Sequence, residues 1–299
     1  MPSARGVPAV KSQSAMEYLM TYGWAILIIA VVLGALFELG VFSSNTFAPK
    51  ASPGACQVFR PNGPGTTSFI NLEGVCNGEL PEYVAYFNGN GFTKQSNLLN
   101  GIPDFTIIAW IYPTQNSYGY IYQEGDGVCP LFGLYGNPLA LSIWNVHTTN
   151  NWVTSSSDIS APINKWSMIA AVLSNGGSDT GTATFYLDGT TPYSVNAQDE
   201  NYTGGGLSSL IGGEYTCSSF VGSYTGNLAN VQIYNASLSA NEIQSLYLEG
   251  IGGAPIDLKN LVGWWPLNGN ANDYSGNGNN GVATDITYTS NWYSGYTVP

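Results

Sequence analysis

Residues 105–111 read FTIIAWI, and this stretch carries the pattern from which the fold is predicted. Successive side chains of a β-strand point to opposite faces, so every second residue from Phe105 to Ile111 falls on one apolar face. Similar runs, rich in apolar and aromatic residues, recur between Gly-, Asn- and Ser-rich clusters from residue 83 to residue 250. Many short strands at near-regular spacing indicate an all-β sandwich.

The composition of the chain excludes one class of partner. Its 299 residues suit a large all-β unit with an appendage. Lys and Arg supply only 7 residues, and the formal net charge is -12. Because no basic patch or stripe is present, the chain lacks the electrostatic footprint of a nucleic-acid-binding protein, and no nucleic acid is expected among its partners.

One long apolar run lies near the N-terminus. Residues 18–37 read YLMTYGWAILIIAVVLGALF and carry no formal charge. A helix of about 20 such residues is long enough to cross a bilayer. Cations precede the run and acids dominate after it, so residues 1–12 are predicted to be cytoplasmic and everything after Phe42 to be outside the cell. The suggestive cleavage junction, Lys11-Ser12-Gln13, precedes the run, unlike that of an ordinary secretory signal.

The stretch KSQSAMEYLMTYGWAILIIAVVLG, residues 11–34, resembles the class III signal of archaeal type IV pilins. The resemblance implies that a prepilin peptidase cleaves between Ser12 and Gln13, which makes Glu17 the fifth mature residue, where such pilins typically carry glutamate. A lone carboxylate on an apolar helix is costly to bury, and the new N-terminus of a neighbouring pilin-like subunit would neutralise it. The alternative is an interfacial Glu on a single-pass membrane anchor.

Four cysteines lie outside the apolar run: Cys56, Cys76, Cys129 and Cys217. Their even number, the absence of a Cys-x-x-Cys pair and the presence of a single histidine favour disulfides in an oxidising compartment over a zinc site. Three pairings are open. The pairing Cys56–Cys76 with Cys129–Cys217 is preferred, because each bridge then stays within one segment.

Residues 83–250 resemble the concanavalin A-like, laminin G-type (LamG) family. The landmarks are YVAYFNGNG (83–91), FTIIAWIYP (105–113), KWSMIAAV (165–172), ATFYLDGT (183–190), LIGGEY (210–215) and GNLANVQIYNASLSANEIQSLY (226–247). The resemblance implies a jelly-roll sandwich. The last landmark is expected to end in a short helix, with Ser239 as N-cap and Glu242 as its capping-box partner.

Residues 261–288, LVGWWPLNGNANDYSGNGNNGVATDITY, look like the opening strand and turn of this family, although here they come last. The segment either completes its own domain, as in a circular permutation, or fills the vacant edge of a neighbouring subunit. A linker of about ten residues can span about 30 Å, so completion within the chain is favoured. A truncated second sandwich is a third reading, but too few residues remain to fill a core.

The predicted organisation has six parts. They are a leader (1–12), a pilin-type hydrophobic helix (13–42), a Pro/Gly-rich stalk with a disulfide loop (43–82), the LamG-like sandwich (83–250), a linker (251–260) and a permuted strand segment that completes the sandwich (261–299).

Aromatic side chains near loops or strand ends are candidate glycan contacts, because sugars stack on exposed rings. The candidates are Trp144, Trp152, Tyr118 and Tyr215.

The Asn-rich loop 268–280 offers oxygen ligands that suit calcium. A weak site at Asp273, Asn88 and Asn230 is one hypothesis, although relatives often carry acids at the two Asn positions. A loop built from Asx-turns is the other.

Catalysis is not expected. No strand presents the facing carboxylates that a glycosidase needs, and His147 has no nucleophile motif around it. The function expected is that of an extracellular pilin-like subunit, anchored by its helix in membrane or filament, whose LamG-like domain serves adhesion or binds glycans or surface proteins. A monomeric membrane-anchored lectin is the alternative, and a surface glycoside hydrolase is less favoured.

Overall fold

The computed structural model describes residues 13–38, 51–61, 67–74, 80–96, 98–99, 101–124, 131–145, 151–155, 159–176, 180–197, 208–216 and 219–299. The chain divides into two compact units, Met1–Ala51 and Ser52–Pro299.

The first unit contains one helix, α1 (Gln13–Glu38). Its side chains are described at residue 20 and at residues 22–34, and all of these are exposed; Trp24, for example, is 66% exposed. Gln13 and Glu17 lie in the first turns, where no side chain is described, and Ser12 lies outside the described residues. Among the residues that the structure describes, no helix has the length and hydropathy needed to cross a membrane.

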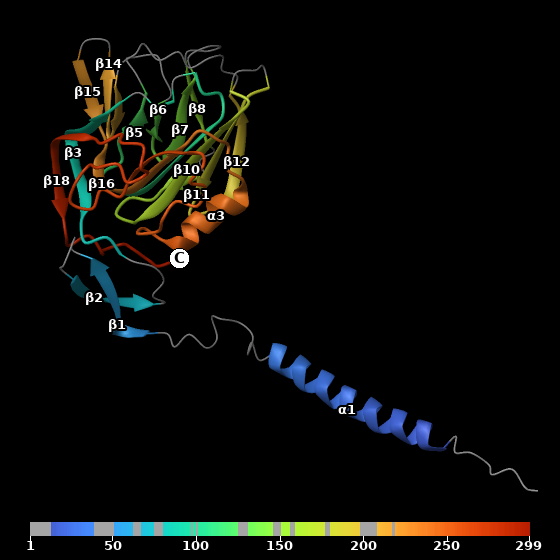
Figure 1. The fold of residues 1–299 in the computed structure, drawn as a ribbon. Coiled ribbons are helices and arrows are strands. Elements are labelled where there is room, and N and C mark those ends of the chain that lie inside the picture. Colours follow the sequence, from blue (N-terminus) through green and yellow to red (C-terminus); the bar gives the residue numbers. More distant parts are fainter. Residues whose placement is uncertain are drawn as a thin grey trace, which may run out of the picture. The chain divides into compact units, whose positions relative to one another are not determined.

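The described regular elements of the second unit are strands, apart from one short helix (Figure 1). Its elements are β1 (Ala51–Pro61), β2 (Thr67–Gly74), β3 (Val84–Gln95), β4 (Phe105–Pro113), β5 (Gly119–Gln123), β6 (Leu131–Tyr135), β7 (Leu139–Asn145), β8 (Asn151–Thr154), β9 (Ser160–Ala161), β10 (Ser167–Ser174), β11 (Thr182–Leu187), β12 (Thr190–Asn196), β13 (Ser209–Ile211), β14 (Gly213–Thr216), β15 (Ser219–Ser223), β16 (Thr225–Tyr234), α3 (Ala240–Glu249), β17 (Leu261–Trp265) and β18 (Val282–Thr289). Strands β1 and β2 pair with each other within the segment predicted as a stalk.

One curled antiparallel sheet forms the sandwich. Its strand order is β12-β11-β10-β4-β16-β3-β13-β5-β6-β7-β8, with β17 beside β16, β18 beside β3 and β9 beside β7. Strand β10 contacts β7, and β12 contacts β8, although neither pair is hydrogen-bonded, so the two halves of the sheet face each other. Apolar side chains from both halves form one core. The predicted all-β jelly-roll sandwich is therefore confirmed.

Strand β4 shows why the core pattern and the burial pattern differ. Every second residue from Phe105 to Ile111 belongs to the core, as predicted. The intervening residues are also buried, because α3 and the C-terminal residues cover the outer face. The ring of Trp110 stacks on Tyr247 of α3 at a centroid distance of 5.8 Å and meets Tyr296 edge-on at 5.6 Å.

The segment after α3 supplies two strands to this same sheet. Strand β17 pairs with β16, with Trp265 opposite Val231. Strand β18 pairs along β3, with Val282 opposite Lys94, and Figure 1 shows these two strands side by side. Trp265 and Leu267 are fully buried in the common core.

Helix α3 begins as its sequence predicts. The Ser239 hydroxyl accepts a hydrogen bond from the Glu242 backbone N–H, and the Glu242 carboxylate accepts one from the Ser239 N–H. The capping box is confirmed.

Candidate functional site

Two exposed tyrosines meet at one end of the β5–β6 pair. Tyr118 directly precedes β5, and Tyr135 is the last residue of β6. The two strands are antiparallel and Gly119 pairs with Leu134, so Tyr118 and Tyr135 are the next residues along the pair. Tyr118 is 57% exposed and Tyr135 36% exposed, and their ring centroids lie 4.8 Å apart with an interplanar angle of 58°. A hydrogen bond with the Tyr118 hydroxyl raises the pKa of Tyr135 above its usual value.

Close approach of the two backbones positions this tyrosine pair. A Cβ on Gly133 of β6 would lie 2.4 Å from the carbonyl oxygen of Gly119 in β5. Only glycine fits at position 133, because any side chain there would clash with the backbone of β5. The absence of a side chain allows the two strands to approach closely at the end where Tyr118 and Tyr135 lie.

The two predicted tryptophan contacts are also brought together. Trp144 of β7 is the direct register partner of Trp152 in β8, although the structure describes neither side chain. Ala140, which is opposite Tyr135, precedes Trp144 by four residues on β7. Four residues of strand span about 13 Å, so the tyrosine pair and the tryptophan positions mark two ends of one stretch of sheet.

The remaining sequence candidate, Tyr215, lies elsewhere. It belongs to β14 and is opposite Phe220 of β15, and its side chain is not described.

Sequence reasoning missed Tyr135. It ends the run LFGLY before a Gly-Asn-Pro turn, and only the pairing of β6 with β5 shows that it meets Tyr118.

Asp273 organises the loop between β17 and β18. Its Oδ1 accepts hydrogen bonds from the backbone N–H groups of Trp264 (3.0 Å) and Ser275 (2.8 Å), and its Oδ2 accepts one from the N–H of Asn279 (2.9 Å). The carboxylate therefore ties the loop back to β17. This is the Asx-turn role that the sequence left open.

The other two residues of the calcium hypothesis are not arranged around Asp273. Asn230 Oδ1 accepts hydrogen bonds from Trp264 Nε1 (2.7 Å) and Gln232 Nε2 (3.0 Å). Asn88 is opposite Thr225, five residues before Asn230 on β16, which corresponds to about 16 Å along the strand.

The structure thus brings Asp273 and Asn230 to opposite ends of Trp264 and leaves Asn88 apart. These residues do not fit one coordination sphere. Among the described residues, no three His, Cys, Asp or Glu side chains cluster as a metal site. Calcium binding stays a prediction without an assigned site.

A buried carboxylate that the sequence did not single out lies inside the sandwich. Glu124 Oε1 accepts the backbone N–H groups of Leu98 (2.6 Å) and Leu99 (2.9 Å), and Oε2 accepts the hydroxyls of Tyr122 and Ser209. Burial raises the pKa of Glu124, and these hydrogen bonds oppose the rise. The side chain is fully buried and holds the chain after β3, so it is not presented to a ligand.

Several sequence candidates lie outside the described residues. They are Cys76, Cys129, Cys217 and His147; Cys56 is in β1, of which no side chain is described. The disulfides stay predictions.

Comparison with known proteins gives a family for the fold. The family described as the concanavalin A-like lectin/glucanases superfamily, in its laminin G branch, matches residues 87–244. A comparison with the curated proteins gave no match.

Two solved structures share the fold. One is a heptameric SAP-like pentraxin from Limulus polyphemus, with TM-score 0.53 and 16% identity over 70% of this chain and 94% of that one. The other is a protein from Bacteroides ovatus that is described as carbohydrate binding, with TM-score 0.53 and 14% identity over 76% of this chain and 64% of that one. At these identities the likeness concerns the fold. Because the family match spans more than half of the chain, this protein belongs to the concanavalin A-like lectin/glucanases superfamily.

Proposed function

We propose that this protein is a surface-displayed binding protein whose sandwich domain holds saccharides. The observation that carries the proposal is the exposed Tyr118–Tyr135 pair, whose rings lie 4.8 Å apart. Apolar C–H faces of a sugar stack on such rings, and tyrosine hydroxyls at the rim bond to sugar hydroxyls. The fold shared with a Bacteroides ovatus protein described as carbohydrate binding supports this choice.

The proposed ligand is uncharged. The chain carries a net charge of -12, which disfavours the approach of sulfated or carboxylated polymers. Binding of a neutral saccharide should consequently change little between low and high salt, because it involves no ion pairing.

Binding rather than turnover is proposed because the described acids near the strand ends accept hydrogen bonds from backbone N–H groups. Asp188 Oδ1 accepts the N–H of Met168 (2.9 Å), as Asp273 and Glu124 accept other backbone N–H groups. Burial raises the pKa of Asp188, and the bond from Met168 opposes the rise. Carboxylates held in this way are not a facing acid–base pair.

Affinity electrophoresis of the full chain through gels containing neutral polysaccharides tests the binding role. Tyr118→Ala and Tyr135→Ala are each expected to weaken retardation about tenfold, since an aromatic contact is worth roughly 1.4 kcal/mol with its buried area. Leu248→Ala, which removes an exposed apolar side chain from α3, is the matched control. Runs with calcium and with a chelator test the calcium prediction. Equal retardation of wild type and both tyrosine variants would refute the site.

We also propose that α1 inserts in the membrane and then packs against α1 of other pilin-like subunits, after a prepilin peptidase has cut between Ser12 and Gln13. The described apolar side chains of α1, including Met20, Trp24 and Leu27, are exposed. They support this proposal, because a helix that exposes apolar side chains needs a lipid or protein partner.

Two measurements test the assembly role. The intact mass of the surface protein should correspond to a chain that begins at Gln13. Glu17→Ala should abolish sheared surface fibres seen by electron microscopy, because Glu17 is proposed to pair with the N-terminus of the next subunit. Unchanged fibres in Glu17→Ala, or retention of residues 1–12, would leave the monomeric anchored lectin as the better description.

A further inference from the structure

The loop between β17 and β18 holds an exposed aromatic ring in a fixed position. Tyr274 is 54% exposed. Its hydroxyl accepts a hydrogen bond from Asn270 Nδ2 (3.1 Å), and its ring packs edge-on against Trp264 with centroids 6.3 Å apart. Its backbone N–H donates to the Trp264 carbonyl (2.7 Å). The ring is therefore restrained at its hydroxyl, its edge and its backbone while its surface stays open.

The backbone under this ring is also fixed. Besides the three bonds to Asp273, Asn279 Nδ2 donates to the Val262 carbonyl (2.9 Å) and Asn277 Nδ2 donates to the Leu261 carbonyl (2.8 Å). Asparagine side chains thus fasten the loop to β17 from several positions. A ligand that stacks on Tyr274 would have little loop or side-chain entropy to overcome.

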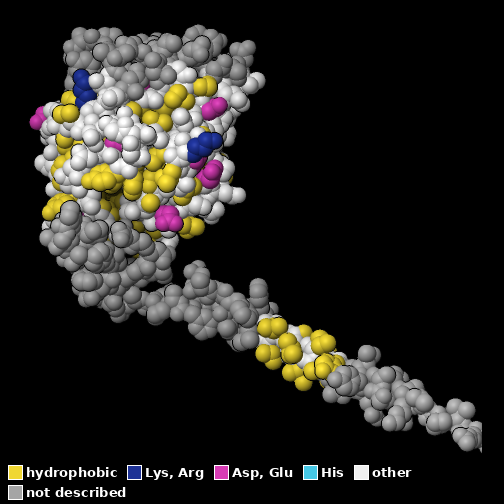
Figure 2. Space-filling model, viewed as in Figure 1, with side chains coloured by type: hydrophobic (Ala, Val, Ile, Leu, Met, Phe, Trp, Pro, Cys, Tyr) yellow, Lys and Arg dark blue, Asp and Glu magenta, His cyan; other side chains and the backbone are white. Residues whose placement is uncertain are grey.

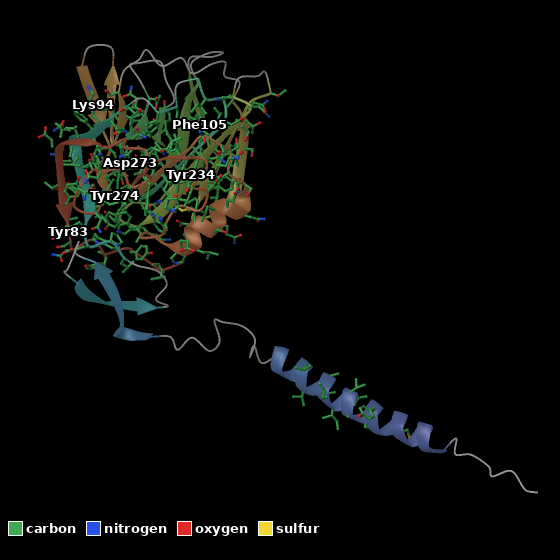
Figure 3. The ribbon with its side chains drawn as sticks, viewed as in Figure 1. Tyr83, Lys94, Phe105, Tyr234, Asp273 and Tyr274 are labelled. Carbon is green, nitrogen blue, oxygen red and sulfur yellow. The ribbon has the colours of Figure 1, made fainter. Side chains whose placement is uncertain are left out.

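The loop around Tyr274 is polar, and its one carboxylate, Asp273, accepts hydrogen bonds from backbone N–H groups. Figure 3 places Asp273 and Tyr274 next to each other on the face turned to the viewer. Figure 2 shows this face as mostly apolar and uncharged polar atoms, with a few Asp, Glu, Lys and Arg side chains among them. Asn272 is exposed, and its side chain makes no hydrogen bond within the described part of the chain. Added side-chain atoms at Gly276 and Gly278 would meet nothing within 4 Å, so this part of the loop is surrounded by open space.

We propose that Tyr274 is the platform of a second saccharide contact, at which a neutral sugar stacks on the ring and bonds to the Asn272 amide. This rests on the proposed function of the domain but uses a different surface. Tyr274 lies in the loop between β17, which pairs with β16, and β18, which pairs with β3, whereas the Tyr118–Tyr135 pair lies at the ends of β5 and β6. Two contacts on one rigid domain bind one long chain by avidity, so polysaccharides are favoured over short oligosaccharides.

Affinity electrophoresis of the full chain in a soluble β-glucan, mannan, galactan and arabinan tests the second contact. Tyr274→Ala is expected to weaken retardation about tenfold in whichever polymer retards the wild type, and Tyr274→Phe, which keeps the ring, about twofold. In Tyr118→Ala the residual binding should still depend on Tyr274, so the double variant should be weaker than either single variant. Leu248→Ala again controls for loss of an exposed apolar side chain.

Each outcome has a separate meaning. If no polymer retards the wild type, the proposed function and this inference both fail. If the wild type is retarded and Tyr274→Ala behaves like Leu248→Ala, only the second contact fails. Should Tyr274→Ala unfold, covalent footprinting of the wild-type chain replaces it: the retarding polymer should protect the peptide containing Tyr274 at least threefold, and unchanged labelling there would overturn the proposal.

Discussion

Gly212 joins β13 to β14 at a point where no other residue fits. Its φ is 84°, and a Cβ there would lie 2.1 Å from Cε1 of Phe87, a fully buried core ring. The backbone N–H of Gly212 donates to the Ile121 carbonyl, and its own carbonyl accepts from Tyr224, so the residue cannot move away without breaking the junction of these strands.

Gly212→Ala is expected to lower the free energy of unfolding by about 3 kcal/mol, combining positive-φ strain with a clash against Phe87. Gly101→Ala is the matched control, because Gly101 has φ 72° but open space around its Cβ position, and it should cost only about 1 kcal/mol. Urea unfolding measures both. Equal losses in the two variants would show that the Phe87 ring yields without cost.

Tyr288 carries a buried hydroxyl that has no hydrogen-bond partner among the described residues. Burial raises its pKa from 10.0 to about 12. The unfolded chain therefore ionises first, and this contribution to stability is fully present below pH 10 and is lost as the pH rises toward 12.

Tyr288→Phe should leave the free energy of unfolding at pH 7 unchanged or raise it by up to about 1 kcal/mol, because an unpaired buried group is removed. It should also flatten the loss of stability between pH 10 and pH 12. Denaturant titrations at pH 8, 10 and 11 measure the slope. Tyr274→Phe, which changes an exposed tyrosine, is the control. An equal slope in both variants would show that the Tyr288 hydroxyl does not cause the loss of stability.

At the scale of single elements, α3 was predictable because its signals are local. The Ser239–Glu242 spacing is a property of four consecutive residues, and the structure shows both reciprocal hydrogen bonds. The core face of β4 was predictable for the same reason, since alternation is read within one strand.

The paired sites were not predictable, because they depend on register between strands. Tyr135 meets Tyr118 only because of the register between β6 and β5, and the sequence pattern of one strand does not reveal its register with another. Asn88 and Asn230 were grouped by resemblance, yet β3 pairs with β16 in a register that sets them five residues apart. Burial of Ile108 and Trp110 on the outer face of β4 likewise required the position of α3, a non-local fact.

Removal of the helix cap gives a prediction at this scale. Ser239→Ala should lower the free energy of unfolding by about 1 kcal/mol, because the Glu242 N–H loses its acceptor and the Glu242 carboxylate loses the Ser239 hydroxyl. Ser245→Ala changes the same residue type within α3, where the hydroxyl only bonds to the Asn241 carbonyl, and should cost nothing. Thermal unfolding measures the stability of both variants. A smaller loss of stability in Ser239→Ala than in Ser245→Ala would argue against a stabilising role for the cap.

For the whole molecule, the C-terminal segment is part of the core and not an attachment to it. Trp265 is fully buried, and its Nε1 donates to the Asn279 carbonyl (3.1 Å), so it joins the core to the loop that carries Tyr274. The sequence identified this segment as a strand out of order, but its partners could not be read from residues 261–299 alone.

Trp265→Ala is expected to lower the free energy of unfolding by about 3–5 kcal/mol through the cavity it leaves. Val282→Ala, in the same segment but on the exposed part of β18, should change it by less than about 0.5 kcal/mol. Chemical denaturation of the full chain measures the free energy of unfolding of both variants. If Trp265→Ala lowers it as little as Val282→Ala does, the rest of the sheet is stable without β17.

The pairing of β3 with β18 also sets an order in time. Lys94 finds its partner Val282 only after almost the whole sandwich has been translated. At about 5–20 residues per second, β3 waits on the order of 10 to 40 s for that partner. Until β18 has left the ribosome, one edge of β3 therefore stays uncovered in the nascent chain and is open to pairing with another strand.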